Sequence, residues 1–209
     1  AEDNIRIEDG FVFDVEKPNY RIPFSDIARE MYKRGSPPSE YGFILANRGF
    51  ADAETGQGDT YGSYSFGCII AEVEVDMDMG QISVSRLYPG VEAGKILQPE
   101  VVRGQINGCC MLGIGYGLTE AVVRDQGRML NNSLTDYLVP TIRDMPKIAD
   151  YVAVEEEYRY SGFGAKGVGE LVLIATPLAI VNAVYDATGV QFSELPLNRE
   201  KTFFALRGL

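Results

Sequence analysis

Apolar and polar positions alternate most regularly in residues 64–88. The apolar residues of 71–75 are separated by glutamates, and a period of two places successive side chains on opposite faces of a strand. Turn-forming residues at 78–80 separate this run from a second alternating run that begins at Ile82. The pattern predicts a long β-hairpin with one buried face and one charged face.

Three shorter segments also have the composition of strands. Residues 5–13 contain the turn-forming dipeptide Asp9-Gly10 between β-branched and aromatic residues, and residues 122–130 turn in the same way at Gln126-Gly127. Residues 151–158 alternate well enough to predict a further strand.

Two segments combine helical apolar spacing with signals for both helix ends. The first has Ser25 as its expected N-cap and ends at Gly35. The second has Thr176 as its expected N-cap and Pro177 in the first helical position, and it ends at Gly189. Both segments are predicted to be short helices.

Residues 99–123 have the apolar spacing of a helix but are unusually rich in glycine. Each interior glycine costs a helix about 1 kcal/mol relative to alanine, so such a helix is expected to pack closely against another backbone or a bound group. The glycines are Gly104, Gly108, Gly113, Gly115 and Gly117.

Together these elements predict an α+β fold in which antiparallel hairpins pack against separate helices. Residues 51–62 are rich in glycine, aspartate and threonine and are expected to form a loop. A chain of 209 residues with 45% hydrophobic residues can form a real core, so residues 1–209 are expected to form one domain.

The chain contains no histidine, which removes the commonest general base and the commonest metal ligand. The cysteines are Cys68, Cys109 and Cys110, which form no CxxC pair and no even-numbered disulfide framework. This favours a reduced, cytoplasmic setting and excludes an iron-sulfur cluster or a four-ligand zinc site built by this chain alone. Electrons, if they are transferred, must leave through another domain or polypeptide.

The net charge of −11 argues against nucleic acid and against an anionic membrane surface as partners, because both would repel the chain. No run reaches the roughly 18 apolar residues that a membrane span needs. The first residues lack the positive and apolar regions of a signal peptide, so the chain is expected to begin like the interior of a longer protein.

Residues 162–170 form the most unusual segment. Gly164, Gly167 and Gly169 bring bare backbone together directly before Glu170, and such a loop can bind an anion. The spacing is neither that of a P-loop nor that of a dinucleotide-binding turn. The spacing alone leaves a second interpretation open, in which the loop is merely tight and Glu170 is favoured by a nearby helix N-terminus.

Gln105 lies on the glycine-rich predicted helix, where its amide can both donate and accept hydrogen bonds to a polar ligand. The alternative is an exposed glutamine without a role. Cys109 and Cys110 lie on an apolar face of the same helix, and without a histidine to activate a thiol they are predicted to be packing residues rather than nucleophiles.

Taken in order, several segments resemble the last part of the large subunit of molybdenum hydroxylases, the family of xanthine dehydrogenase and aldehyde oxidase. The resemblance covers roughly residues 64–206. The segments are YSFG at 64–67, EVEVD at 72–76 with Gly80, GQING at 104–108 with Gly113 and Gly115, GAKGVGE at 164–170 and NAVYDATG at 182–189.

The resemblance implies a role for three residues. Glu170 corresponds to the base that deprotonates a molybdenum-bound hydroxyl, which attacks a carbon of the substrate while hydride passes to a sulfido ligand. Gln105 corresponds to a glutamine that hydrogen-bonds near the molybdenum ligands, and the backbone of Gly169 is expected against the cofactor. The fold must then bring together sites that lie 65 residues apart, from Gln105 to Glu170. A buried carboxylate beside the loop is expected to act as the base.

The resemblance also implies the setting of the chain. The cofactor is molybdenum-molybdopterin, shared with sequence outside this chain, and iron-sulfur clusters and FAD are expected on other domains or subunits. The partners are the remaining domains or subunits of the hydroxylase and a small-molecule substrate, an aldehyde or an N-heterocycle such as a purine, hydroxylated with oxygen from water. No direct metal ligand is assigned to this chain, which is expected to be inactive in isolation.

Four positions depart from the family pattern. Leu171 and Val172 stand where a proline pair often follows the glutamate, Glu92 stands where an aspartate is expected, and Gln98 replaces the asparagine of an Asn-Pro pair. Two further hypotheses remain from other classes of protein: a non-catalytic assembly domain with the same fold, and an anion-binding module that uses residues 164–169.

Overall fold

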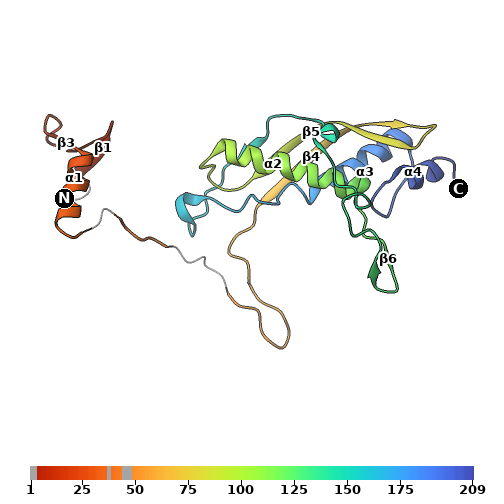
Figure 1. Cartoon of the computed structure of the whole chain (residues 1–209), viewed down its shortest axis with the longest axis horizontal. Coiled ribbons are helices and arrows are strands. Elements are labelled where there is room, and N and C mark those ends of the chain that lie inside the picture. The colour runs from red at the N-terminus through yellow and green to blue at the C-terminus, as the bar shows by residue number, and fades with distance from the viewer. Residues whose placement is uncertain (1–3, 37–38, 44–48) are drawn as a thin grey trace. The chain divides into compact units, whose positions relative to one another are not determined.

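The computed structural model describes residues 4–36, 39–43 and 49–209 and divides into two compact units, Ala1–Phe43 and Ile44–Leu209 (Figure 1). No helix among the described residues is long and apolar enough to cross a membrane.

The first unit is a three-stranded antiparallel sheet with one helix. Its strands are β1 (Ile5–Glu8), β2 (Phe11–Asp14) and β3 (Arg21–Pro23), in that order. The predicted turn joins β1 to β2, and both Asp9 and Gly10 have positive φ angles.

Helix α1 (Phe24–Lys33) follows β3 directly. The prediction that Ser25 caps this helix was wrong, since Ser25 lies inside it. The Phe24 N–H donates to the carbonyl of Gly10 at 2.8 Å, so the hairpin turn satisfies the first donor of the helix without a serine cap.

The second unit is built on the long hairpin that the alternating pattern predicted. Strands β4 (Phe66–Asp76) and β5 (Gln81–Glu92) pair antiparallel, with a bulge between Glu72 and Val73. Gly80, with a φ of 67°, ends the turn, and a Cβ at this position would lie 2.7 Å from the carbonyl oxygen of Arg199. Only glycine fits where the hairpin turn meets the C-terminal helix.

Two short strands extend this sheet on the other side of β5. Strands β8 (Lys147–Ile148) and β9 (Val152–Val154) both pair parallel with β5. The strand predicted at 151–158 is therefore limited to three residues, and it joins a mixed sheet rather than another antiparallel hairpin. The predicted hairpin at Gln126-Gly127 is present as β6 (Arg124–Asp125) and β7 (Arg128–Met129).

Helices α2 (Pro99–Ile114) and α3 (Ala175–Thr188) pack against each other and against the β4–β5 hairpin (Figure 1). A π-helical segment, η2 (Gly115–Thr119), continues α2, and α4 (Arg199–Ala205) lies near the hairpin turn. Two 3₁₀ turns, η3 (Ile142–Asp144) and η4 (Gly162–Gly164), lie in the connections. The largest fully buried apolar side chains come from β5, both long helices and the segments before α3 and α4: Leu87, Ile106, Val172, Ile180, Val184 and Leu197.

Helix α3 begins before its predicted N-cap. Thr176 is the second residue of the helix and is fully buried, and its hydroxyl donates to the carbonyl of Val172 at 2.7 Å. A Cβ on Gly113 of α2 would collide with the Thr176 side chain, so the two helices meet at this point. The C-terminal end was predicted correctly, because Gly189 has the left-handed φ of 73° that ends many helices.

Candidate functional site

The glycine loop, residues 162–170, is joined along its first half to the end of β5. Gly94 and Ala165 form an antiparallel bridge, in which the Lys166 N–H donates to Ala93 at 2.9 Å and the Lys95 N–H donates to Gly164 at 3.0 Å. Gly94 has a φ of 65°, and a Cβ there would collide with the Gly164 carbonyl. The close approach of these two segments therefore requires glycine at this position.

A buried ion pair holds the same junction. The Lys166 ammonium lies 3.0 Å from the Glu92 carboxylate, and the two side chains are 10% and 11% exposed. The other Glu92 oxygen accepts the Gly94 N–H at 2.8 Å. Burial by itself raises the pKa of Glu92, but hydrogen bonds from Gly94, Lys166 and the Glu156 N–H outweigh it and hold the pKa below its ordinary value.

The second half of the loop is fixed through its carbonyl oxygens. The Ser65 hydroxyl donates to Gly167 at 2.8 Å. From helix α2, the Gln105 amide donates to Gly169 at 3.4 Å and the Cys109 thiol donates to the same oxygen at 2.9 Å. Gln105 and Cys109 lie four residues apart and so share one face of the helix.

The structure therefore brings Gln105 and Gly169 into contact, beside Glu170. This was expected from the sequence, whereas the contributions of Ser65, Cys109 and the Glu92–Lys166 pair were not. Cys109 was predicted to be a packing residue; it is indeed buried, and it also contacts the loop. The sequence contained one signal for this contact: Cys109 lies four residues after Gln105 and so shares its face of the helix.

Glu170 itself is exposed in this chain. Its backbone carbonyl accepts the Leu173 N–H at 3.2 Å as the chain winds toward α3. Helix α3 begins only at Ala175, so Glu170 does not lie in its first turn, where a helix dipole acts. Burial raises the pKa of the Cys109 thiol, and the neighbouring Glu170 charge raises it further, which keeps the thiol a donor to Gly169.

The backbone N–H groups at the start of the loop already donate to protein carbonyls. Gly164 donates to Ser161, Ala165 to Gly162 and Lys166 to Ala93. A loop binds an anion through free N–H groups, so these three contacts count against the anion-binding interpretation for the first half of the loop.

The surface around Gln105 leaves backbone uncovered. A Cβ placed on Gly104, Gly108 or Gly167 would meet nothing within 4 Å, and one placed on Gly169 would meet only the Gln105 amide at 3.8 Å. The uncovered glycine backbone allows a bulky group to approach the helix and the loop closely. The exposed Gln105 amide can hydrogen-bond to a polar group bound there. The residues present therefore fit a large cofactor.

Two cavities lie near these elements. One, of about 410 Å³, adjoins the glycine loop, and its lining includes Lys166, Gly167 and three tyrosines, Tyr61, Tyr158 and Tyr160. It lies on the side of the loop that carries the ion pair, and its lining is partly polar.

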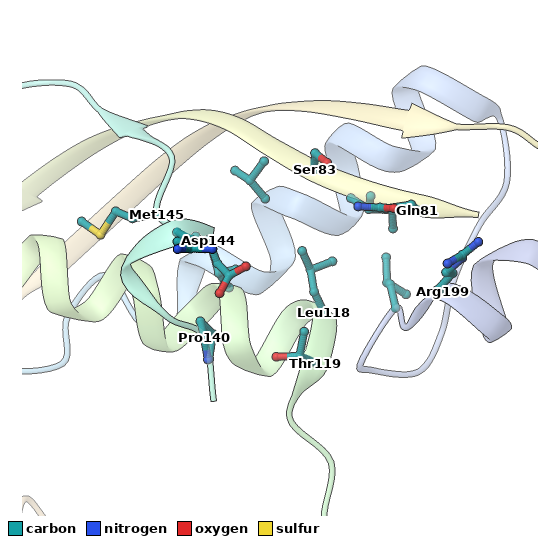
Figure 2. Close-up of a pocket in the computed structure, with 13 residues that line it drawn as sticks. Gln81, Ser83, Leu118, Thr119, Pro140, Asp144, Met145 and Arg199 are labelled. Atoms are coloured by element: carbon teal, nitrogen blue, oxygen red, sulfur yellow. The ribbon is translucent and has the colours of Figure 1, made fainter. Parts of the chain in front are cut away.

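A larger cavity, of about 490 Å³, contains none of the predicted site residues. Leu118, Asp144 and Arg199 project toward it from three separate elements (Figure 2). Along α2, Ile114 of this cavity is about 14 Å from Gln105, at 1.5 Å per residue. The Asp144 carboxylate is already engaged, because it accepts the backbone N–H and the hydroxyl of Thr141 at 2.7 and 2.8 Å, and these bonds lower its pKa.

Residues 1–146 match the family model of the molybdopterin cofactor-binding domain. The chain belongs to this family. The match includes the first 63 residues, which the sequence motifs had left unassigned, and it ends before the glycine loop. Among the described residues of this molybdopterin-binding domain, no group of three potential ligands could hold a metal ion.

Known relatives agree with this assignment. The domain is 34% identical over 165 residues to the xanthine dehydrogenase molybdenum-binding subunit of Escherichia coli, covering 77% of this chain and 22% of that protein. It is 31% identical to the nicotine 6-hydroxylase large subunit of Paenarthrobacter nicotinovorans, covering 100% of this chain and 25% of that protein. The chain thus spans between a fifth and a quarter of the length of these two relatives.

Solved structures share the fold over most of the chain. The aldehyde oxidoreductase from Desulfovibrio gigas superposes with a TM-score of 0.73 at 33% identity, covering 86% of this chain and 20% of that one. Quinoline 2-oxidoreductase from Pseudomonas putida 86 superposes with a TM-score of 0.74 at 29% identity, covering 99% of this chain and 26% of that one. The α+β fold is therefore that of the molybdenum-binding subunits of this enzyme family.

Proposed function

We propose that this chain supplies the catalytic base and part of the cofactor-binding surface of a molybdenum-dependent hydroxylase. Glu170 is the base, and the Gln105 amide and the Gly169 backbone contact the molybdopterin cofactor. The observation that carries the proposal is the hydrogen bond from Gln105 to Gly169, because it joins two segments 64 residues apart at one open surface beside Glu170.

The exposure of Glu170 suits this role. A general base must lie within reach of the proton that it accepts, and an exposed side chain can reach a group bound at this surface once other parts of the enzyme complete the site. The bound cofactor supplies the two-electron redox chemistry of the hydroxylation. Gln105 and the fixed carbonyl of Gly169 hold the Glu170 segment in place while the proton is transferred.

The substrate class in this proposal is an aldehyde or an N-heterocycle, with the new oxygen coming from water. Its support is the activity for which the relatives are named, among them a nicotine 6-hydroxylase, a quinoline 2-oxidoreductase and an aldehyde oxidoreductase. The other domains or subunits of the enzyme supply the remaining cofactor contacts, and iron-sulfur and flavin groups there accept the electrons.

The test is to co-express the chain with its genomic neighbours and purify the complex. Molybdenum content and dye-linked hydroxylation of aldehydes and heterocycles are then compared for the wild type and Glu170→Gln, with Glu200→Gln on α4 as a control at another exposed glutamate. The proposal predicts that Glu170→Gln retains molybdenum and loses roughly 10² or more in turnover.

Two other outcomes assign the chain differently. Molybdenum retained with unchanged turnover in Glu170→Gln would remove Glu170 from the mechanism. No molybdenum in any purified complex would favour the non-catalytic assembly domain.

A further inference from the structure

We propose that the buried Glu92–Lys166 pair is a positioning device that fixes the loop carrying Glu170. The inference rests on the proposed function of Glu170 and adds two residues that act through it. Neither Glu92 nor Lys166 is placed in contact with substrate or cofactor; both act on the path of the chain that leads to Glu170.

The pair joins two segments at one point. Glu92 ends strand β5, Lys166 belongs to the glycine loop, and the second oxygen of the Glu92 carboxylate accepts the N–H of Gly94, two residues further along. A carboxylate held by an ammonium group and by a backbone N–H has little freedom to move, and it restrains the loop against the end of β5. Lys166 is four residues before Glu170, so a shift at Lys166 is carried to Glu170 through a short stretch of chain.

Further along the loop, the Ser65 hydroxyl donates to Gly167 at 2.8 Å, and the two contacts at Gly169 are weaker. The Gln105 amide lies 3.4 Å from the Gly169 oxygen, which is longer than the usual range of about 2.7–3.2 Å, and the second donor to that oxygen is a thiol. A charged pair with little exposed surface is a stronger restraint than either. The ion pair is therefore the principal fixed point from which the position of Glu170 is set.

The chain contains a matched control at the same junction. Lys95 lies 2.6 Å from Glu155, whose other oxygen accepts the Ile96 N–H at 3.1 Å. This second Lys–Glu pair therefore links the residues that follow β5 to the residue that follows β9. Its side chains are 45% and 35% exposed, and it does not include the glycine loop. Water can replace its contacts, so its loss is expected to matter little.

The experiment compares Lys166→Gln, Glu92→Gln and Glu155→Gln in the purified complex. Lys166→Gln is the mildest change, since glutamine keeps a donor and the Glu92 carboxylate keeps the Gly94 N–H as a partner. Turnover is measured per bound molybdenum, and hydrogen exchange is measured over residues 162–170. We expect kcat to fall roughly tenfold to a hundredfold in the first two variants with KM nearly unchanged, because misplacing a catalytic group lowers kcat.

Exchange in the loop is expected to rise in the same two variants while exchange in α3 stays as in the wild type. Glu155→Gln is expected to match the wild type in both measurements, and Glu92→Asp, which retains the charge, is expected to recover most of the lost kcat. Equal kcat values and equal loop exchange for Lys166→Gln and Glu155→Gln would overturn the proposal.

The two proposals can fail separately. If Glu170→Gln retains full turnover, the proposed base is wrong, whereas the exchange measurement still shows whether the pair fixes the loop. If Glu170→Gln is inactive but Lys166→Gln is fully active, the base stands and the positioning role is wrong.

Discussion

The glycines near the two ends of helix α2 have opposite surroundings. At the C-terminal end, a Cβ on Gly113 would collide with Thr176. Nearer the N-terminus, Gly104 and Gly108 face open space beside the exposed amide of Gln105. The closed end packs against α3 within the chain, and the open end presents bare backbone to a group outside it.

The largest effect is expected at the closed end. Gly113→Ala introduces overpacking worth about 3 kcal/mol against Thr176, less about 1 kcal/mol gained in helix propensity, for a net loss of about 2 kcal/mol in the free energy of unfolding. Gly104→Ala, in the open half of the same helix, is expected to stabilise the chain by up to about 1 kcal/mol. Urea denaturation of both variants measures the difference, and equal effects would contradict the comparison.

The open end is tested at Gly169. The chain itself leaves room for a methyl group there, so Gly169→Ala is expected to unfold at the same urea concentration as the wild type. In the assembled enzyme its molybdenum content is expected to fall about tenfold, equivalent to about 1.4 kcal/mol, because the methyl group displaces the cofactor. Gly162→Ala, at a loop glycine that also has room for a methyl group, is the matched control, and full molybdenum retention in Gly169→Ala would show that nothing packs against that backbone.

A smaller effect is expected from the pH dependence of the Glu92 contacts. The folded protein lowers the pKa of Glu92 below 4.5, so the unfolded chain binds the extra proton and these contacts stabilise the fold fully only above that pH. The stabilisation is lost as the pH falls through the folded pKa. Other carboxylates with lowered pKa values, such as Glu155 and Asp144, contribute in the same window.

The contribution of Glu92 is obtained by comparing the wild type with Glu92→Gln between pH 6 and pH 3. The difference in their free energies of unfolding is expected to shrink as the pH falls. A difference that stays constant over this range would show that ionised Glu92 does not stabilise the fold.

Local sequence was sufficient to predict the turns and the C-terminal end of α3. Asp9-Gly10 and Gln126-Gly127 turn the two short hairpins, Gly80 turns the long one, and Gly189 ends α3, since each requires a backbone conformation that few residues adopt. The N-terminal ends of the helices were predicted less well. In α1, the Phe24 N–H donates to the carbonyl of Gly10, 14 residues earlier, and no local pattern reveals this contact.

The same distinction between local and long-range contacts explains why only part of the site was predicted. Gln105, Gly169 and Glu170 lie in motifs that can be read along the chain. The Glu92–Lys166 pair links residues 74 positions apart, and the parallel pairing of β8 and β9 that helps to form its junction depends on the tertiary fold. Glu92 therefore stood out in the sequence only as a departure from the family pattern.

The most direct test of the central claim is the rate at which substrate reduces the molybdenum centre in the complex without oxygen or added acceptor. Mixing substrate with wild-type, Glu170→Gln and Glu200→Gln enzymes of equal molybdenum content isolates the step that needs the base. We expect Glu170→Gln to be reduced roughly 10² or more times slower than the other two enzymes, with similar substrate affinity. Reduction of all three at the same rate would contradict the account of Glu170 as the base.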